Sequence, residues 1–386
     1  MKYRSGARYK IVNIRKRTLV RLVDVLLNSV HKFLDFPTDH TTPIDQDKAA
    51  IRRILCIRLA YLGDVVMTLP VLQALRVAFP HAQIDFITSR SAASLFDNNP
   101  IIRNVIPFDA PWFYPNSRDS VACIIPVIQK KAYDLGIDFR GDIRNIFHLL
   151  WRPGIIRRLS YVSGGGGSLL THPVEWSGLT HKVEYHLDLL RAVGIPAVSA
   201  MPRLHLGDEE RTGIRALFPE LSVPPIVVHP GSRLPAKRWP VERFRDLVVR
   251  LVRAGVGPVW VVGGPGEESL VEEIRSVSPG VRGTSRPLSI REFACLCEQA
   301  ILLVCHDSAP MHVAAAVGCP VVALFGPSCA AETGPVGVSN IVVEGTCVVK
   351  ERCDESRCHH RNTFECMQSI SVEKVYEACR TILHRN

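Results

Sequence analysis

Short hydrophobic runs alternate with amphipathic helical stretches through the first half of the chain. Between the first two runs, apolar positions from Val65 to Phe79 recur at helical spacing until Pro80. Short continuous apolar runs are typical of strands in a parallel sheet that helices cover on both faces. The strands predicted in this half are residues 54–57, 84–88, 105–108 and 135–138, and a helix over residues 181–193 closes the series.

The same alternation starts again at residues 226–229, after a connector over residues 197–224 that contains a polar helix at 208–218. Two consecutive α/β series predict two doubly wound, Rossmann-like domains that face each other across a cleft, with ligand bound between them. The further strands predicted are residues 259–262, 301–305 and 321–325, and the further helices are residues 241–254, 267–277, 293–299 and 311–317.

The length and composition fit a folded enzyme of two domains. A chain of 386 residues exceeds the size at which one hydrophobic core usually stops growing. Its 22% charged and 7% aromatic residues are ordinary for globular proteins. We therefore predict a basic arm and linker over residues 1–46, an N-terminal domain over residues 47–200 and a C-terminal domain over residues 201–386.

The N-terminal arm is strongly basic, because residues 1–34 hold nine lysines and arginines against one acid, Asp24, for a net charge of +8. A leading basic, amphipathic segment favours an anionic membrane surface over nucleic acid, which is more often bound by a folded basic face. A merely solvated arm is the alternative. The apolar positions at helical spacing are Leu19, Leu22, Val23, Leu26, Val30 and Phe33.

The arm does not resemble a signal peptide, because Asp24 and Lys32 interrupt its apolar run and no small-residue cleavage site follows. The longest uncharged stretch, Ser308 to Ala331, contains prolines and glycines that a membrane span would not tolerate without support. We expect a cytoplasmic protein that is peripheral on the cytoplasmic face of the inner membrane, with no transmembrane helix.

Four of the twelve cysteines gather near the C-terminus, beside His359 and His360. Their spacing lacks the paired C-x2-C arrangement that makes a zinc site convincing, so a metal site and a structural role both stay open. A disulfide framework is not expected in the cytosol. The four are Cys347, Cys353, Cys358 and Cys366.

The run Gly164–Gly167 predicts a mobile loop near an acceptor, because it lacks the strand-then-helix context of a phosphate-binding loop. No G-x-G-x-x-G fingerprint, Walker lysine loop or G-x-S-x-G elbow stands at a suitable strand end. Their absence from the sequence argues against a dehydrogenase, a phosphate-loop NTPase and a serine hydrolase.

Asp64 follows the first predicted strand and opens the next helix, so its carboxylate should face the predicted cleft. An aspartate in this position can cap the helix, because it accepts amide hydrogen bonds and complements the helix dipole. It can also act as a general base, provided that its surroundings raise its basicity. Both roles stay open on local sequence alone.

Residues 229–240, H-P-G-S-R-L-P-A-K-R-W-P, connect a predicted buried strand to a helix. The small residues let backbone amides approach an anion, Ser232 can donate a hydrogen bond, and Arg233, Lys237 and Arg238 supply positive charge. These are the groups that a diphosphate needs. A basic surface loop is the alternative.

Two more strand ends carry polar residues. In C-H-D-S-A-P-M-H, which begins at Cys305, Asp307 or Ser308 can cap the next helix, and the amides of Ser308 and Ala309 can point at a phosphate. His312 can bond phosphate or simply pack. In G-G-P-G-E-E, over residues 263–268, a carboxylate can hold ribose hydroxyls or cap a helix.

From about Arg53 onward, these segments together resemble glycosyltransferase family 9, the ADP-heptose:lipopolysaccharide heptosyltransferases. The resemblance implies the GT-B fold of two Rossmann-like domains. It rests on five stretches in this order: I-L-C-I-R-L-A-Y-L-G-D-V-V-M-T-L-P, D-F-R-G-D-I-R-N, H-K-V-E-Y-H-L-D-L-L-R-A-V-G-I-P, V-V-H-P-G-S-R-L-P-A-K-R-W-P and H-D-S-A-P-M-H-V-A-A-A-V-G-C-P-V-V-A-L-F-G.

The resemblance implies an inverting, metal-independent transfer of a heptose from an ADP-sugar to a lipopolysaccharide core or another cell-envelope glycan, with no cofactor. It implies that Asp64 is the general base and that Lys237 stabilises the leaving diphosphate. Arg140 and Arg144, as cations on the first domain, can hold an anionic glycolipid, with surface solvation as the alternative. The other donor-binding residues that the resemblance implies are Gly63, Ser232, Arg233, Glu268, Asp307, Ser308, Ala309 and His312.

Two other functions remain compatible with the sequence. One is a family 9 transferase that uses a different nucleotide sugar, since the contacts to the base and to the sugar are not readable from the chain. The other is a catalytically silent nucleotide-sugar-binding protein, which the presence of both Asp64 and Lys237 disfavours.

Overall fold

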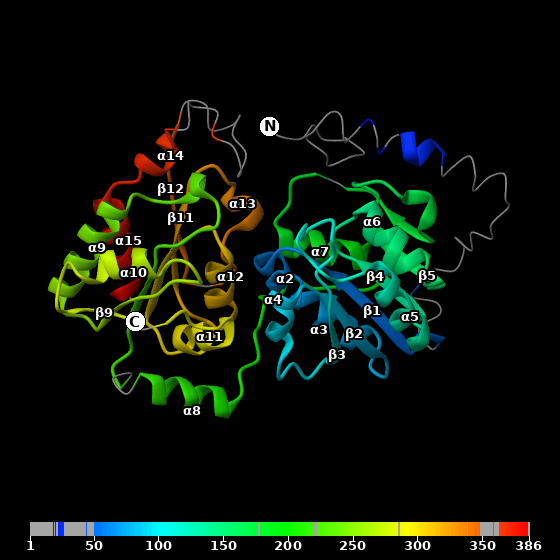
Figure 1. Ribbon diagram of the computed structural model, residues 1–386, viewed down its shortest axis with the longest axis horizontal. Coiled ribbons are helices and arrows are strands. Elements are labelled where there is room, and N and C mark those ends of the chain that lie inside the picture. Colours follow the sequence, from blue (N-terminus) through cyan, green and yellow to red (C-terminus); the bar gives the residue numbers. More distant parts are fainter. Residues whose placement is uncertain are drawn as a thin grey trace. The chain divides into compact units, whose positions relative to one another are not determined.

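The computed structural model divides into two compact units, Met1–Ala200 (unit 1) and Met201–Asn386 (unit 2). Within the described residues, each unit contains one six-stranded sheet, and all the strand pairs of both sheets are parallel (Figure 1). The residues described are 18, 20, 22–26, 44, 50–176, 178–218, 222–284, 286–337, 339–347, 358 and 363–384.

Unit 1 has the strand order β3-β2-β1-β4-β5-β6. Its strands are β1 (Arg53–Arg58), β2 (Gln83–Thr88), β3 (Ile102–Pro107), β4 (Leu135–Asp138), β5 (Arg157–Tyr161) and β6 (His172–Val174). Its helices are α2 (Leu62–Val66), α3 (Leu69–Ala78), α4 (Arg90–Ala93), α5 (Val121–Lys131), α6 (Ile143–Asn145) and α7 (Lys182–Arg191), with a π-helical stretch, η3 (Ile146–Trp151), after α6.

Unit 2 has the strand order β12-β11-β10-β7-β8-β9. Its strands are β7 (Ile226–His229), β8 (Val259–Val261), β9 (Val281–Gly283), β10 (Leu302–His306), β11 (Val321–Phe325) and β12 (Ile341–Glu344). Its helices are α8 (Asp208–Leu217), α9 (Val241–Ala254), α10 (Glu268–Arg275), α11 (Ile290–Glu298), α12 (Ala309–Ala316), α13 (Ala330–Thr333), α14 (Glu365–Gln368) and α15 (Val372–Leu383).

In both sheets the strand order reverses beside the first strand of the unit. In unit 1, β1 pairs with β2 on one side and β4 on the other, and in unit 2, β7 pairs with β8 and β10. At such a reversal the two loops at the carboxyl ends lead away to opposite faces of the sheet and leave a crevice between them, where open α/β sheets bind ligands. The loops after β1 and β4, and after β7 and β10, are therefore where functional side chains are expected.

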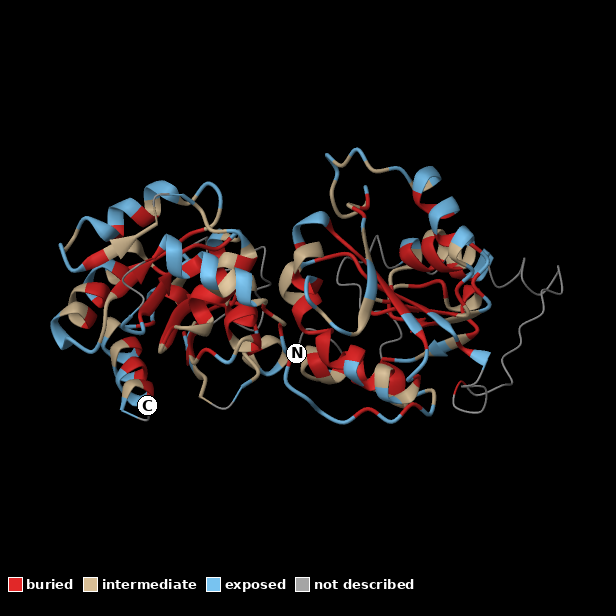
Figure 2. Ribbon diagram, turned by 90° about the horizontal axis from the view of Figure 1, so that it is seen from below, coloured by how far each residue is buried: buried red, intermediate tan, exposed pale blue. Residues whose placement is uncertain are grey.

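The core of each unit forms because the central strands are apolar on both faces. Every residue of β4, β7, β10 and β11 is buried. Figure 2 shows these strands as a buried layer in each unit, between helices whose outward sides are exposed. The predicted α/β fold class is confirmed, with two doubly wound sheets.

The structure corrects one predicted helix. The apolar spacing from Val65 to Phe79 suggested a single helix, but α2 ends at Val66 and α3 begins at Leu69. Pro70 lies in the first turn of α3, has no amide hydrogen to continue a helical ladder, and favours a new helix start. The hydroxyl of Thr68 donates to the Val65 carbonyl at 2.6 Å and closes the end of α2.

The glycine run of unit 1 also differs from its prediction. A side chain on Gly164 would lie 2.0 Å from the carbonyl oxygen of Gly141, and Gly166 donates its amide hydrogen to Asp24 at 2.6 Å. Gly165 and Gly166 have positive φ angles of 87° and 80°. The run is therefore packed on both sides, in a conformation that glycine adopts without strain, rather than an open loop.

Two other predictions lie partly outside the described residues. Most of the N-terminal arm, residues 1–46, is not described, and neither are Cys353, His359 and His360. Among the described residues, no three His, Cys, Asp or Glu side chains are grouped as a metal site would require, and the described cysteines carry thiols rather than disulfides. None of the helices in the described part of the chain has the length and hydrophobicity needed to cross a bilayer.

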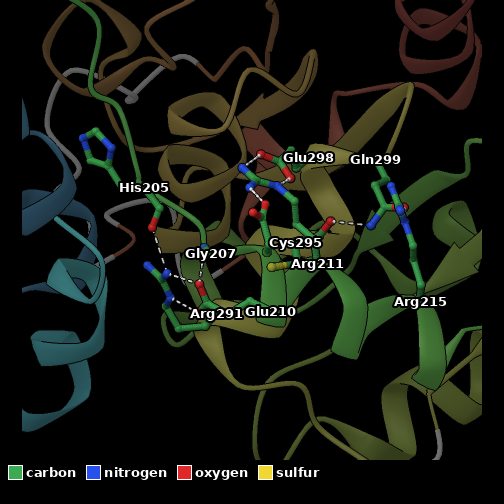
Figure 3. A network of polar contacts seen from close by, with 10 residues as sticks. His205, Gly207, Glu210, Arg211, Arg215, Arg291, Cys295, Glu298 and Gln299 are labelled. Carbon is green, nitrogen blue, oxygen red and sulfur yellow. Dashed lines mark hydrogen bonds and ion pairs between the residues drawn. The ribbon is translucent and has the colours of Figure 1, made fainter. Parts of the chain in front are cut away.

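Helix α8 is fastened to α11 by charged pairs, which Figure 3 shows from close by. The guanidinium of Arg291 is buried and donates to Glu210 at 2.6 Å and to the His205 carbonyl at 2.8 Å. Arg211 makes a bidentate pair with Glu298 at 2.8 and 2.9 Å. These contacts attach the start of unit 2 to the body that carries β10.

Replacing Arg291 with alanine should destabilise the protein by about 2–3 kcal/mol, because it leaves Glu210 without its buried partner. Urea unfolding followed by tryptophan fluorescence measures this as a lower midpoint. Arg211→Ala is the matched control, since its pair with Glu298 is more exposed, and the shift should be smaller. Equal midpoints for the Arg291 variant and the unchanged protein would contradict the prediction.

Candidate functional site

Asp64 lies in the first turn of α2, directly after the carboxyl end of β1. One carboxylate oxygen pairs with the Arg58 guanidinium at 2.7 Å, and the other accepts the Tyr61 amide hydrogen at 3.0 Å. The peptide bond between Ala60 and Tyr61 is cis. Asp64 thus caps its own helix, as the sequence suggested it could, and its side chain stays 22% exposed at the edge of the sheet.

The surroundings of Asp64 favour its ionised form. Burial by itself would raise the pKa of the carboxyl group, but the Arg58 charge, the Tyr61 amide and the more distant charges of Arg140 and Lys182 outweigh it. The pKa therefore lies well below its ordinary value. A general base at this position was expected to have a raised pKa. The structure instead lowers the pKa of Asp64, because the Arg58 guanidinium contacts the carboxylate.

The loop after β4 brings two arginines to the same edge of unit 1. Arg140 donates to the Ala60 carbonyl at 3.0 Å, and its guanidinium lies 4.3 Å from the centre of the Phe113 ring. Arg144 lies 5.2 Å from the same ring and makes a bidentate pair with Asp142 at 2.8 and 2.6 Å. Both cations therefore lie near one aromatic ring, although Arg144 is already paired with a carboxylate.

A buried carboxylate, Asp138, shapes this loop. It is fully buried at the end of β4, accepts the Gly141 amide hydrogen at 2.7 Å and the Asn145 amide at 2.8 Å, and lies 3.1 Å from the Ser160 hydroxyl. Burial raises its pKa above the ordinary value. Asp138 fixes the backbone that carries Arg140, a role that the sequence did not reveal.

In unit 2, the loop between β7 and α9 is held by His306, the last residue of β10. The ring Nε2 accepts the Trp239 amide hydrogen at 2.8 Å, so the neutral ring carries its proton on Nδ1, which donates to the Gly231 carbonyl at 3.2 Å. His306 is fully buried, and burial lowers its pKa to about 4. One side chain thus ties together both ends of the predicted diphosphate loop.

The same loop places Lys237 against Asp307. The Lys237 ammonium lies 2.7 Å from the Asp307 carboxylate, and both side chains are at least nine-tenths buried. Ser232, which is on the same loop as Lys237, is also buried, and its carbonyl accepts a hydrogen bond from Arg238 at 2.7 Å. Arg233 is exposed. The structure therefore brings together the predicted residues of two loops that are seventy positions apart.

The two glutamates after β8, Glu267 and Glu268, make different contacts. Glu267 turns back toward the sheet, accepts the Gly264 amide hydrogen at 2.8 Å and lies 3.8 Å from His229 Nε2. A side chain on Gly231 would meet this carboxylate at 1.9 Å, so a larger residue there would displace Glu267 from its present position. Glu268, which the sequence favoured, is exposed and accepts the Gly266 amide hydrogen at 3.1 Å.

Helix α12 starts at the same edge, with Ser308 as its N-cap residue. Ser308 and Ala309 are half-buried, and His312 is buried one turn further on. The first amide groups of a helix are oriented toward an anion, and the helix dipole favours negative charge at this end. In unit 2, the arrangement of a buried ammonium, a helix N-terminus and a glycine-lined loop matches the chemistry of diphosphate binding.

The sequence missed several side chains that organise these edges. No individual role was predicted for Arg58, His306 or Glu267, although all three lie in the predicted strand-end segments. Each is the last residue of a strand or follows one closely, which is the signal that could have identified it. Gly63, which the resemblance implies as a donor contact, lies in the first turn of α2 next to Asp64.

The sequence of this chain is similar to those of known glycosyltransferases. Residues 124–363 match glycosyltransferase family 9 (heptosyltransferase). Lipooligosaccharide heptosyltransferase 2 of Haemophilus influenzae is 24% identical over 84% of this chain and 98% of its own length.

Solved structures share the fold. A family 9 glycosyltransferase from Veillonella parvula superimposes with a TM-score of 0.76 at 24% identity, over 87% of this chain and 98% of its own. The Escherichia coli ADP-heptose lps heptosyltransferase II gives a TM-score of 0.71 at 21% identity, over 86% and 99% of the two chains. The GT-B fold predicted from the sequence is confirmed.

The buried state of His306 predicts a pH dependence of stability. Its pKa is about 4 in the folded protein and about 6.5 when exposed, so its neutral form contributes stability that is complete above pH 6.5. As the pH falls from 6.5 toward 4, the unfolded chain takes up a proton and the unfolding free energy should drop by roughly 3 kcal/mol.

Urea unfolding of His306→Gln across this pH range should show a flatter curve than the unchanged protein. His384→Gln is the control, since His384 is exposed at the end of α15 and should leave the curve as it is. A His306 variant whose stability falls as steeply as that of the unchanged protein would contradict the assignment.

Proposed function

The chain belongs to glycosyltransferase family 9, and from this premise we propose that it transfers a heptose from ADP-heptose to a lipopolysaccharide core or a related cell-envelope glycan. The enzyme class, a glycosyltransferase, follows from the family. The donor and the acceptor are proposed because the relatives are named as heptosyltransferases of lipooligosaccharide and lipopolysaccharide. The observation that carries the proposal is the buried Lys237–Asp307 pair beside the N-terminus of α12.

Unit 2 is proposed to bind the donor diphosphate. Lys237 exchanges its partner from Asp307 to a phosphate oxygen, and the amides of Ser308 and Ala309 donate to the same group. Ser232, Arg233 and His312 complete the set. A fixed ammonium beside the leaving diphosphate stabilises the charge that develops there as the glycosidic bond breaks, and no metal ion is needed for that charge.

Nucleoside recognition is proposed for the acidic pair after β8. Glu268 was the residue expected from the resemblance, and it is exposed at the start of α10. Glu267 lies closer to the diphosphate loop, because its carboxylate contacts Gly231 and Gly264. A carboxylate accepts hydrogen bonds from ribose hydroxyls, so we assign that contact to this pair, with Glu267 as the inner member.

Unit 1 is proposed to supply the base. Asp64 is ionised because its pKa is lowered, so it can accept a proton at any pH near neutrality. It is a weak base, but an acceptor hydroxyl becomes strongly acidic once its oxygen bonds to the anomeric carbon. Proton transfer to Asp64 late in the displacement therefore suits its low pKa, and attack opposite the leaving diphosphate inverts the anomeric configuration.

The acceptor and the location of the enzyme are also proposals. Arg140 and Arg144 offer cations to an anionic glycolipid, beside the Phe113 ring. The basic residues of the first 34 positions favour an anionic lipid surface, which suits an enzyme on the cytoplasmic face of the inner membrane. Neither nucleic acid nor a cofactor has a part in this reaction.

Asp64→Asn should lower the transfer rate by about 10²–10⁴-fold, because the amide no longer accepts the proton. Donor binding should persist, since the diphosphate contacts belong to unit 2. The measurements are heptose transfer from ADP-heptose and thermal stabilisation by ADP. Asp97→Asn, an exposed aspartate of the same unit, is the control. Full activity of the Asp64 variant would place the base elsewhere.

ADP and ADP-heptose should stabilise the protein against heat, in the presence of EDTA as well. A ligand at a hundred times its Kd adds about 2.7 kcal/mol to the unfolding free energy when it binds only the folded state. The double variant Lys237→Gln with Asp307→Asn, which replaces the buried ion pair by neutral groups, should lose this stabilisation.

Other outcomes of the nucleotide panel separate the alternatives. Stabilisation by UDP or GDP sugars instead would keep the fold and the mechanism but overturn ADP-heptose as the donor. Stabilisation by ADP-heptose without transfer to any lipopolysaccharide acceptor would favour a silent nucleotide-sugar-binding protein.

A further inference from the structure

A short helical segment near the N-terminus, residues 22–26, lies against the glycine run of unit 1; its helix is drawn in blue in Figure 1. The contact is made by Asp24, whose side chain is 4% exposed and accepts the Gly166 amide hydrogen at 2.6 Å. A buried carboxylate is costly unless hydrogen bonds compensate for the lost water. Asp24 is therefore the group that holds this segment on unit 1.

The glycine run is shaped to receive the segment. A side chain on Gly165 would lie 2.4 Å from the Val20 side chain and 3.4 Å from the Asp24 carboxylate. Any residue larger than glycine at position 165 would displace the helix, apart from the strain that the positive φ of 87° would add. These contacts indicate that Gly165 and Gly166 form the surface on which the N-terminal segment docks.

The other side of the glycine run contacts the loop after β4. Gly164 forms a parallel bridge with Asp142, and a side chain on Gly166 would lie 3.1 Å from the Ile143 side chain. This loop also carries Arg140 and Arg144. The glycine run therefore packs between the N-terminal segment on one side and the loop after β4 on the other.

The segment turns apolar side chains away from this contact. Leu22, Val25 and Leu26 are 58%, 61% and 66% exposed. Their spacing of three and four residues places them on one helix face, opposite Asp24. Three adjacent exposed apolar side chains on one helix are a surface for a partner rather than a scattered feature.

We propose that residues 22–26 are a lipid-docking helix, whose Leu22, Val25 and Leu26 enter an anionic bilayer surface while Asp24 fastens the helix to the glycine run, which packs against the loop after β4. Charge argues for lipid as the occupant, because the first 34 residues carry a net charge of +8. The inference rests on the proposed function in one respect, since a glycolipid acceptor lies in that same surface. Docking then presents the loop of Arg140 and Arg144 to the bilayer.

The first test is sedimentation of the full chain with vesicles of phosphatidylethanolamine and phosphatidylglycerol, compared with phosphatidylcholine alone. The triple variant Leu22→Ser, Val25→Ser, Leu26→Ser should lower partition onto the anionic vesicles by about tenfold or more, because it removes the apolar face and no charge. Val77→Ser is the matched control, since Val77 is 75% exposed on α3 and has no place in this surface.

The second test separates lipid contact from the Asp24 contact. Asp24→Ala keeps the apolar face, so vesicle binding should remain, but hydrogen exchange of the Gly166 amide should accelerate by about tenfold or more. Gly165→Ala should have the same effect, because its methyl group meets Val20. Neither readout depends on sugar transfer, so the inference can fail while the proposed function stands.

Three results would overturn the inference. One is unchanged sedimentation of the triple serine variant. Another is unchanged exchange at Gly166 in Asp24→Ala. The third is a fall in the oligomeric mass of the triple variant in light scattering without any change in vesicle binding, which would show that a second copy of the chain covers this face instead of lipid.

Discussion

The placement of the principal charged groups depends on the reversal of strand order in each sheet. β1 pairs with both β2 and β4, and β7 with both β8 and β10, so in each unit two loops separate over the carboxyl edge. Asp64 and Arg140 lie on the two loops of unit 1, and Lys237 and Asp307 on the two loops of unit 2. The buried strands below hold these loops, and their last residues Arg58, Asp138 and His306 orient the loops.

Two of the charged groups at these edges, Asp64 and Lys237, are paired with charged residues of the protein itself. Arg58 neutralises Asp64, and Asp307 neutralises Lys237. An unpaired charge at this depth would be expensive, so each pairing compensates for the burial of its charges. In the proposed reaction, substrates exchange partners with these ion pairs, so the binding free energy is the difference between two paired states. An anionic donor can compete for Lys237 because it brings more negative charge than one carboxylate.

The sequence predicted the architecture well where the strands are mostly apolar, as in β7, β10 and β11. A strand that is buried on both faces appears in the sequence as a continuous hydrophobic run, which is easy to recognise. It failed at the sheet edges. β5 begins with two arginines, and β6 is three residues long with Pro173 at its centre, so neither shows a hydrophobic signal. Helices α5 and α15 and strands β9 and β12 were not predicted either.

For the site, local motifs identified the residues that could meet ligand but not the partners that orient them. Asp138 and His306 act through contacts with backbone that is distant in sequence, and no pattern of neighbours encodes such contacts. The same holds for Asp24. In the sequence it only interrupts an apolar run, and its partner Gly166 lies 142 positions away.

The self-contained sheets have a consequence for how the protein is made. Unit 1 completes its sheet with β6 (His172–Val174), and the first strand of unit 2 begins only at Ile226. Among the described strands, β1 to β6 all belong to unit 1 and β7 to β12 all belong to unit 2. Domains generally fold as units, N-terminal first, as a chain leaves the ribosome. Unit 1 can therefore close its core while unit 2 is still being translated, and the exposed edges of its unfinished parallel sheet are short-lived.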